Sequence, residues 1–143
     1  MDRVLIIDDE PSVVNFLSIL LQREGYEVIT AGSGPEALKK FRENPADVVL
    51  VDLKMPEMDG LQVLSKIKSM DNETPVIIMT AYASIESAIE AMRKGAFDYV
   101  MKPFKVDEIA LVVKRALQER KLILENIELT RKAKQYEFQE MVG

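Results

Sequence analysis

Charged and hydroxyl side chains stand directly after four short apolar runs of the sequence. They are Asp8, Asp9 and Glu10 after residues 3–7, Asp52 after 47–51, Thr80 after 75–79 and Lys102 after 98–101. Adjacent carboxylates repel one another, and holding them at the end of a buried element costs free energy. A divalent cation could neutralise the aspartates, and the ammonium group of Lys102 could offset the remaining charge.

This mixture of groups favours a site for Mg²⁺ and a phosphoryl group. Mg²⁺ prefers carboxylate and backbone carbonyl oxygens, keeps several waters and often shares its coordination shell with phosphate oxygens. The Thr80 hydroxyl and the Lys102 ammonium would supply the donors and positive charge that phosphoryl oxygens need. The sequence contains neither a P-loop nor a G-x-G-x-x-G motif, so no nucleotide cradle is predicted. The phosphoryl group must then end on the protein or arrive on a small donor.

Asp52 is the best candidate to receive that group, because a carboxylate can act as a nucleophile and form an acyl phosphate. It follows the third apolar run, between the acidic cluster and Thr80. Taken singly, an aspartate after a strand is more often a helix cap or turn former. Thr80 alone is an ordinary strand-end residue, and Lys102 alone is an ordinary solvated lysine. The functional interpretation rests on their joint placement at successive strand ends.

The composition excludes several kinds of chemistry for this chain. Its 143 residues contain no cysteine and no histidine, which excludes disulfides, thiolate metal sites and histidine general bases. A net charge of −5 argues against non-specific binding of nucleic acid. No apolar run is long enough to span a membrane, and the N-terminus lacks the layout of a signal peptide. A cytoplasmic protein without membrane contact is therefore expected.

Short apolar runs alternate with segments of helical periodicity along the chain. The runs predicted as strands are "RVLII" (3–7), "EVITA" (27–31), "DVVLV" (47–51), "PVIIM" (75–79) and "DYVM" (98–101). Several are apolar throughout, as in a parallel sheet covered on both faces. The predicted helices cover about 11–24, 33 onwards, 61–69, 84–94 and 106 onwards. Gly25 and Gly95 are expected to end the first and fourth helices, and Ser33 to cap the second.

This alternation predicts a doubly wound α/β domain with a five-stranded parallel sheet, of the flavodoxin-like kind. In such a sheet, ligands bind at the carboxyl ends of the strands, where the strand order reverses. The strand-end residues named above should therefore converge on one crevice. After about Gln118 the sequence becomes charged and helical, so the last helix is expected to extend into a linker.

The chain resembles the receiver domain of two-component response regulators over about residues 1–120. The resemblance is carried by "LIIDDE" (5–10), "VDLKMPEMDG" (51–60), "MTAYAS" (79–84) and "FDYVMKPF" (97–104). The stretch "TAYASIESAIEAMRKGAFDYVMKPF" is especially similar to receivers of the nitrogen-regulatory type, which precede an ATPase domain that activates sigma-54 RNA polymerase. "FQEMVG" (138–143) resembles the start of that ATPase domain. We therefore expect a receiver at 1–120 and a helical linker at 121–143, leading to a downstream domain absent from this chain.

The resemblance implies a phosphorylation-dependent signalling switch. Asp52 would accept a phosphoryl group from a histidine of a sensor kinase, and the product would control a sigma-54-dependent transcription activator. The chain would not be an enzyme beyond its own phosphoryl transfer and dephosphorylation. DNA and RNA polymerase would be contacted only through the absent domains.

The resemblance also implies a role for each site residue. Asp9 and Asp52 would ligate Mg²⁺ directly, Asp8 mainly through water, and Lys54 through its backbone carbonyl. Thr80 and Lys102 would bind the phosphoryl oxygens. Two further features complete the implied set, a cis Lys102–Pro103 peptide bond and Tyr99 as an aromatic switch that moves inward when Thr80 is drawn to the phosphate. Gly60 would end the tight turn after Asp52.

Two other functions are compatible with parts of this pattern. A phosphatase of the aspartyl-phosphate class uses the same nucleophilic aspartate and lysine, but it usually carries a general acid two residues after the nucleophile, where this chain has Lys54. A structural module with a degenerate site is the third reading, and the complete acidic set argues against it.

The last helix is expected to pair two chains, because residues 109–136 contain no glycine or proline and consist mostly of good helix formers. A single solvated linker helix is the alternative, although an isolated helix of this length is marginal in water. The expected seam between the two helices has two possible registers. The second keeps Val113 and Ile127 of the first and uses Ala116 and Ile123 instead. The first register is Val113, Leu117, Arg120, Leu124, Ile127, Arg131, Lys134 and Phe138.

Overall fold

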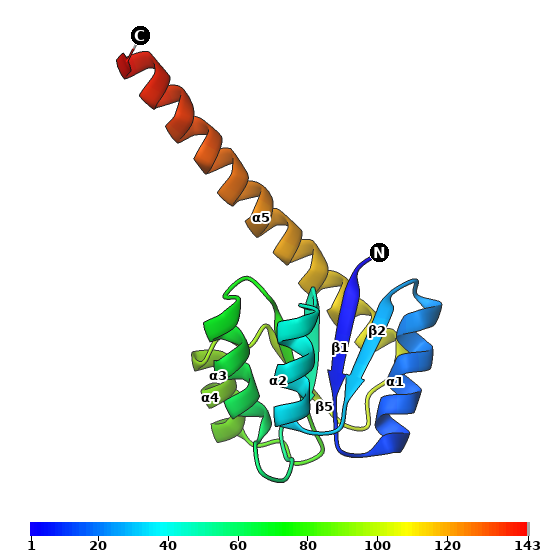
Figure 1. Cartoon of the computed structure of the whole chain (residues 1–143). Coiled ribbons are helices and arrows are strands. Elements are labelled where there is room, and N and C mark those ends of the chain that lie inside the picture. Colours follow the sequence, from blue (N-terminus) through cyan, green and yellow to red (C-terminus); the bar gives the residue numbers. More distant parts are fainter. Residues whose placement is uncertain (143) are drawn as a thin grey trace.

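The computed structural model describes the backbone of residues 1–142 and the side chains of residues 1–135. Five parallel strands form one sheet in the order β2-β1-β3-β4-β5 (Figure 1). The strands are β1 (Arg3–Ile7), β2 (Glu27–Ala31), β3 (Val48–Asp52), β4 (Val76–Thr80) and β5 (Asp98–Met101). The helices are α1 (Pro11–Arg23), α2 (Gly34–Glu43), α3 (Gly60–Met70), α4 (Ile85–Arg93) and α5 (Val106–Val142). The predicted doubly wound fold is confirmed.

Two strands begin one residue later than the sequence pattern predicts. The amide of Arg3 donates to the carboxylate of Asp47 at 2.7 Å, while the Asp47 amide donates to the Arg3 carbonyl at 2.8 Å, so Asp47 binds the start of β1 partly through its side chain. Pro75 has no amide hydrogen to give to the ladder, and only its carbonyl takes part, accepting from Val49. Asp52 and Thr80 are the last residues of β3 and β4 rather than the first residues after them, because they still pair with Met79 and Met101 of the neighbouring strands.

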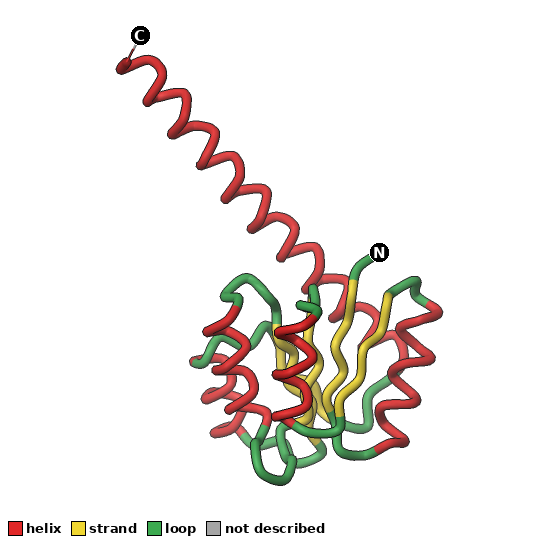
Figure 2. The backbone as a smooth tube through the Cα atoms, viewed as in Figure 1, coloured by secondary structure: helices red, strands yellow, loops and turns green. Residues whose placement is uncertain are grey.

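Helices cover both faces of the sheet and enclose two apolar layers (Figure 2). On one face α2, α3 and the Ala91 side of α4 pack against the side chains of Leu5, Ile7, Val49, Val51 and others. On the other face, α1 and the first part of α5 cover residues such as Ile6, Leu50 and Ile77. Every residue of β3 and β4 is buried, which explains why these runs are apolar without alternation.

Local signals place the helix ends close to where the sequence predicts them. Gly25 and Gly95 follow α1 and α4 with φ angles of +93° and +97°, a conformation that favours glycine. Ser33 caps α2 by accepting a hydrogen bond from the amide of Glu36. The capping box at α3, formed by Asp59 and Gln62, was not predicted, although its D-x-x-Q spacing is a recognisable signal.

The apolar stripe of α4 is not covered by the domain. Ile85 is 80% exposed, Ile89 and Met92 are also exposed, and Ala91 is the buried residue of the helix. The reason is topological, because β5 is an edge strand and offers the helix sheet on one side only. The sequence pattern identified the stripe but not its exposure.

α5 runs for 37 residues and continues well beyond the sheet (Figure 1). Its first part packs into the core through Ile109, Val112, Val113 and Ala116. From residue 121 to residue 135 the side chains are exposed apart from the partly buried Glu128. Within the part of the chain that the structure describes, no helix combines the length and apolarity needed to cross a membrane.

The burial of α5 changes the predicted pairing seam. Val113 and Ala116 are fully buried in their own domain, and Arg120 forms an ion pair with Asp47 at 3.2 Å. None of the three is available to a partner helix, so a seam can only begin after Arg120. Phe138, the last residue of the predicted seam, lies outside the described side chains.

Candidate functional site

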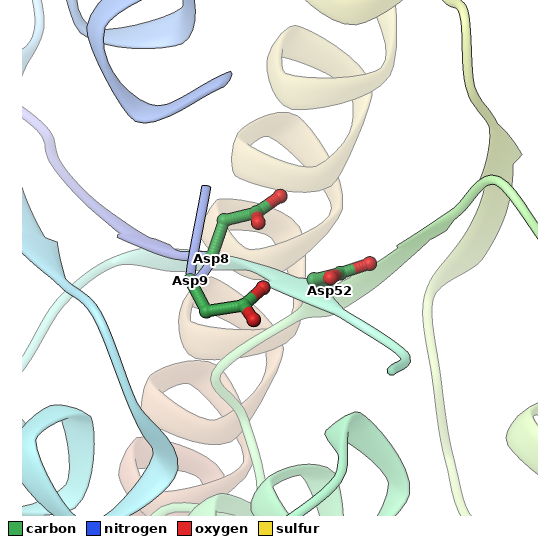
Figure 3. Close-up of side chains that lie close together, drawn as sticks. All are labelled: Asp8, Asp9 and Asp52. Atoms are coloured by element: carbon green, nitrogen blue, oxygen red, sulfur yellow. The ribbon is translucent and has the colours of Figure 1, made fainter. Parts of the chain in front are cut away.

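Three aspartates meet at the carboxyl ends of β1 and β3. Asp8 and Asp9 directly follow β1, and Asp52 ends β3. One carboxylate oxygen of each lies within 4.8 Å of those of the other two (Figure 3). The strand order reverses between β1 and β3, because β2 lies on one side of this pair and β4 and β5 on the other. The aspartates thus occupy the position where ligands bind in open α/β sheets.

Asp8 is the most deeply buried of the three, with 2% exposure. Its backbone amide donates to the carbonyl of Ala31 at 3.1 Å, which fixes the turn after β1. One carboxylate oxygen accepts from the amide of Glu10 at 3.0 Å. The other accepts from Nζ of Lys102 at 2.7 Å. Both oxygens of Asp8 are therefore already engaged by the protein.

Lys102 reaches the cluster from the end of β5 and bridges two of its carboxylates. Its Nζ lies 2.7 Å from Asp8 Oδ2 and 3.3 Å from Asp52 Oδ1. Burial by itself lowers the pKa of Lys102, but the hydrogen bond to Asp8 and the charge of Asp52 outweigh it, so the pKa is raised. The ammonium group is thus held in its charged form beside Asp52.

Asp52 carries the clearest sign of unbalanced charge. It is 5% exposed, and burial together with the charge of Asp8 raises its pKa to about 6. Lys102 opposes this shift and Asp9 adds to it. The single ammonium group of Lys102 does not balance the charge of three carboxylates. Carboxylate oxygens that lie this close together are the ligands that a hard divalent cation requires. The donor set therefore fits Mg²⁺.

Thr80 ends the strand next to that of Asp52, and Tyr99 lies within the edge strand β5. Thr80 is fully buried at the end of β4, and its hydroxyl oxygen accepts from the amide of Tyr82 at 2.9 Å. That bond uses the oxygen as an acceptor and leaves the hydroxyl hydrogen to donate. Tyr99, in β5, packs against the apolar layer beneath α2 and α3, and its hydroxyl lies 2.7 Å from Ser87 Oγ.

The loop after β3 comes close to the site because of one glycine. A Cβ atom on Gly60 would lie 2.5 Å from the carbonyl oxygen of Asp52, so only glycine allows this approach. The amide of Gly60 donates to the carbonyl of Leu53 at 2.9 Å and closes the loop. Gly60 thus ends the loop, as the resemblance implied, and glycine is needed there because of this close contact. Lys54 lies in the loop with its side chain exposed.

The structure thus brings Asp8, Asp9, Asp52 and Lys102 into one cluster, with Thr80 at the end of the adjacent strand. The Lys102–Pro103 peptide bond is cis, as the resemblance implied. Sequence reasoning missed Ser87 as the partner of Tyr99. The S-x-x-S spacing of Ser84 and Ser87 could have identified the helix cap, but nothing in the sequence identified the contact with β5.

An apolar groove opens beside the cluster. The rings of Phe16 and Phe104 stack with centroids 6.4 Å apart. A cavity of about 430 Å³ lies next to them, and Lys102 belongs to its wall. The groove therefore extends from α1 to Lys102 of the aspartate cluster. Its lining residues are Glu10, Ser12, Val13, Phe16, Ala81, Lys102, Pro103 and Phe104.

Comparison with known proteins places this geometry in a family. The model of the response regulator receiver domain matches residues 4–114. The chain is 51% identical over 118 residues to the regulatory protein AtoC of Escherichia coli (strain K12), which covers 82% of this chain and 26% of that protein. It is 40% identical over 142 residues to a putative response regulator NtrX-like of Rickettsia bellii, covering 98% of this chain and 29% of that protein. The chain thus spans between a quarter and a third of the length of these relatives.

Solved structures agree with the sequence relatives. A response regulator receiver domain protein from Clostridium thermocellum superposes with a TM-score of 0.82 at 37% identity, covering 86% of this chain and 99% of that one. NtrX from Brucella abortus superposes with a TM-score of 0.85 at 35% identity, covering 90% of this chain and 29% of that one. The aspartates at the ends of β1 and β3 lie within the region that the family model matches. The chain belongs to the family of response regulator receiver domains of two-component systems, and within it to the nitrogen-regulatory type.

Proposed function

We propose that Asp52 accepts a phosphoryl group from a phosphohistidine of a sensor kinase. A carboxylate oxygen of Asp52 would form a bond to phosphorus while the bond between phosphorus and the imidazole nitrogen breaks, and the electron pair of that bond would stay on the imidazole. The observation that carries this proposal is the placement of Asp52 between two further aspartates and Lys102.

The side chains around Asp52 have suitable chemistry for this step. Lys102 would direct its ammonium group, now shared between Asp8 and Asp52, towards a phosphoryl oxygen. Thr80 would donate its free hydroxyl hydrogen to another. Mg²⁺, held by Asp9 and Asp52 directly, Asp8 through water and the Lys54 carbonyl, would neutralise charge on the carboxylates and the phosphoryl group. The same residues would also support hydrolysis of the acyl phosphate, the only other reaction we assign to the chain.

The apolar groove supports a kinase as the donor. The Phe16–Phe104 pair and the cavity beside it lie next to Lys102, so a helical partner bound there would bring its histidine close to Asp52. Phe16 and Ile19 of α1 are both exposed, and exposed apolar side chains that gather beside a reactive group indicate an interaction surface. A phosphatase acting on other substrates is not favoured, since Lys54 stands where its general acid would be.

We further propose that phosphorylation is a switch for a downstream sigma-54-dependent transcription activator. A phosphoryl group adds roughly −1.5 to −2 charge, by analogy with other phosphorylated side chains. Thr80 and Lys102 would turn towards it, and Tyr99 and α4 would rearrange with them. The uncovered stripe of α4, formed by Ile85, Ile89 and Met92, is the surface that would change.

Mass spectrometry of the intact protein tests the acceptor directly. Incubation with acetyl phosphate and Mg²⁺ should add the mass of one phosphoryl group that is lost in mild base. Asp52→Asn should abolish the gain, whereas Asp47→Asn, a control far from the site, should not. A stable gain in the Asp52→Asn variant would contradict the assignment of the acceptor.

A further inference from the structure

One hydroxyl group at the start of α4 contacts both the helix cap and β5. Ser87 Oγ lies 2.7 Å from the hydroxyl oxygen of Tyr99 and 2.8 Å from Ser84 Oγ. It also lies 3.2 Å from the carbonyl oxygen of Ser84 and 3.3 Å from its amide nitrogen. Four polar atoms therefore surround a single serine oxygen.

A serine hydroxyl cannot satisfy four partners at once, because it has one hydrogen to donate and two lone pairs to accept with. The Ser84 amide can only donate to it, and the Ser84 carbonyl can only accept from it. The two shortest contacts are those with the hydroxyls of Tyr99 and Ser84. The bond to Tyr99 therefore competes with the longer contacts to the Ser84 backbone, for the hydrogen of Ser87 Oγ where Tyr99 accepts and for one of its lone pairs where Tyr99 donates.

Those longer contacts belong to the N-terminal cap of α4. The cap is a reciprocal box in which Ser84 Oγ accepts from the Ser87 amide at 3.1 Å and Ser87 Oγ accepts from the Ser84 amide. α4 has nine residues, and Ala91 is its buried one, so packing holds this helix weakly. For a short helix with little buried surface, end contacts have a large share in its stability.

The start of α4 also has space to move. A cavity of about 200 Å³ is lined by Ser84 and Ser87 together with Tyr82, Leu53, Lys54, Asp59 and Leu61. This space separates the first turn of α4 from the loop after β3. A shift of this turn would meet few packed side chains.

We propose that Ser87 is a positioning residue that couples Tyr99 to the cap of α4. While the bond between the two hydroxyls is made, Tyr99 is held against α4, and Ser87 Oγ is shared between Tyr99 and the cap. When Tyr99 moves away, Ser87 turns fully to the Ser84 backbone and the first turn of α4 tightens. The coupling rests on the proposed function only for the event that moves Tyr99, namely phosphorylation of Asp52.

Amide exchange with solvent, measured by NMR in the full chain, tests the coupling without phosphorylation. Tyr99→Phe removes the competing hydroxyl, so protection of the Ser84 amide should rise by about 2- to 12-fold, the effect of one hydrogen bond. Ser87→Ala should lower this protection, and Tyr99→Phe should have no effect on it in the Ser87→Ala background. Ser87→Thr, which keeps the hydroxyl, should restore the response. Protection of core amides such as that of Ile78 reports whether each variant is folded.

The contrary result is equally clear. If Tyr99→Phe lowers protection of the Ser84 amide, or changes it by the same factor with and without the Ser87 hydroxyl, the proposal is wrong. Phosphorylation with acetyl phosphate forms a second arm, in which the native chain should gain protection at Ser84 and Ser87→Ala should not. If phosphorylation itself fails, the mass of the protein stays unchanged, and this result counts against the proposed function. The comparison of Tyr99→Phe with and without the Ser87 hydroxyl still decides the coupling.

Discussion

At the scale of single residues, the site has more negative charge than the protein neutralises. Lys102 binds Asp8 more closely than Asp52, at 2.7 Å against 3.3 Å. Asp9 is exposed and adds to the raised pKa of Asp52. Because the Asp8 oxygens are already hydrogen-bonded to Lys102 and to the Glu10 amide, Asp9 and Asp52 have the greater freedom to take a cation.

Mg²⁺ affinity should follow this division. Asp9→Ala should weaken binding more than about tenfold, because even partners outside the coordination shell contribute 10- to 100-fold. Asp8→Ala should weaken it less, since Asp8 mainly binds Lys102. Calorimetric titration of each variant measures the affinities, with Asp47→Ala as the control. An unchanged affinity in Asp9→Ala would remove that residue from the ligand set.

The raised pKa of Asp52 predicts how stability depends on pH when Mg²⁺ is removed by a chelator. The folded state retains the Asp52 proton up to pH about 6, whereas the unfolded state loses it near the ordinary value of 3.8. The folded chain thus binds more protons in this interval, so this group destabilises the fold as pH rises from about 4 to 6. Asp52→Asn removes the effect. The free energy of unfolding of this variant, minus that of the native chain, should therefore increase by on the order of 2 kcal/mol from pH 4 to pH 6.

Denaturant unfolding at a series of pH values measures this difference. Subtracting the free energy of unfolding of the native chain from that of the variant at each pH cancels the contribution of the other carboxylates. Added Mg²⁺ should reduce the difference, because the cation would stabilise the charged form of Asp52. A gap that is constant between pH 4 and 6 would contradict the assigned pKa.

At the scale of elements, the sequence was enough to place the acidic strand ends together but not to give the contacts among their side chains. Strand ends such as Asp8 and Asp52 could be placed together because the carboxyl ends of parallel strands share one edge of the sheet. The preference of Lys102 for Asp8 and the bond between Ser87 and Tyr99 depend on side-chain orientations that periodicity does not encode. The exposure of Ile85 depends on α4 lying beside an edge strand, which requires the strand order.

Gly60 offers a test of how the loop after β3 supports the acceptor. Gly60→Ala would place a Cβ atom 2.5 Å from the Asp52 carbonyl oxygen, and this neighbour is backbone that cannot rotate away. The variant should lose about 1–3 kcal/mol of stability, as overpacked positions do, and its phosphorylation should slow. Gly32→Ala is the matched control, because its Cβ would meet only the flexible Glu36 side chain at 3.7 Å. Equal stability of the two variants would show that the loop adapts.

At the scale of the whole molecule, the site lies at the carboxyl ends of the strands, and α5 leaves the domain at their opposite, amino ends (Figure 1). α5 runs from the site end to the other end as one continuous helix, and we propose that it carries a change at the site to its exit. Where α5 leaves the domain, Arg120 binds Asp47, which also accepts from the amide of Arg3. This contact fixes the helix to the start of β1. The domain boundary near residue 120 stays a prediction, supported by the exposure of the residues that follow.

The extension of α5 leaves apolar side chains that a second chain would cover. Ile123 and Ile127 continue the helix stripe that packs Ile109, Val113 and Ala116 into the core, because successive positions in this series are separated by three, four or seven residues. Leu124 lies three residues before Ile127 and flanks this stripe. Ile127 is 50% exposed. A partner helix would remove this surface from water, with about 25 cal/mol gained per Å² of apolar area. We therefore propose a homodimer through a two-stranded coiled coil that begins after Arg120.

Sedimentation equilibrium decides whether this dimer forms. The native chain should be dimeric at tens of micromolar, whereas truncation after Arg120 or the substitution Ile127→Asp should shift it towards monomer, because a buried carboxylate in an apolar seam is strongly unfavourable. Lys132→Asp is the control, since Lys132 is exposed and five residues along the helix turn it to a different face. A monomeric native chain, both before and after phosphorylation, would contradict the coiled coil and leave α5 as a single solvated linker. With the dimer present, two receivers would lie side by side at the base of one helical stalk, and a change at either site edge would alter the geometry delivered to the next domain.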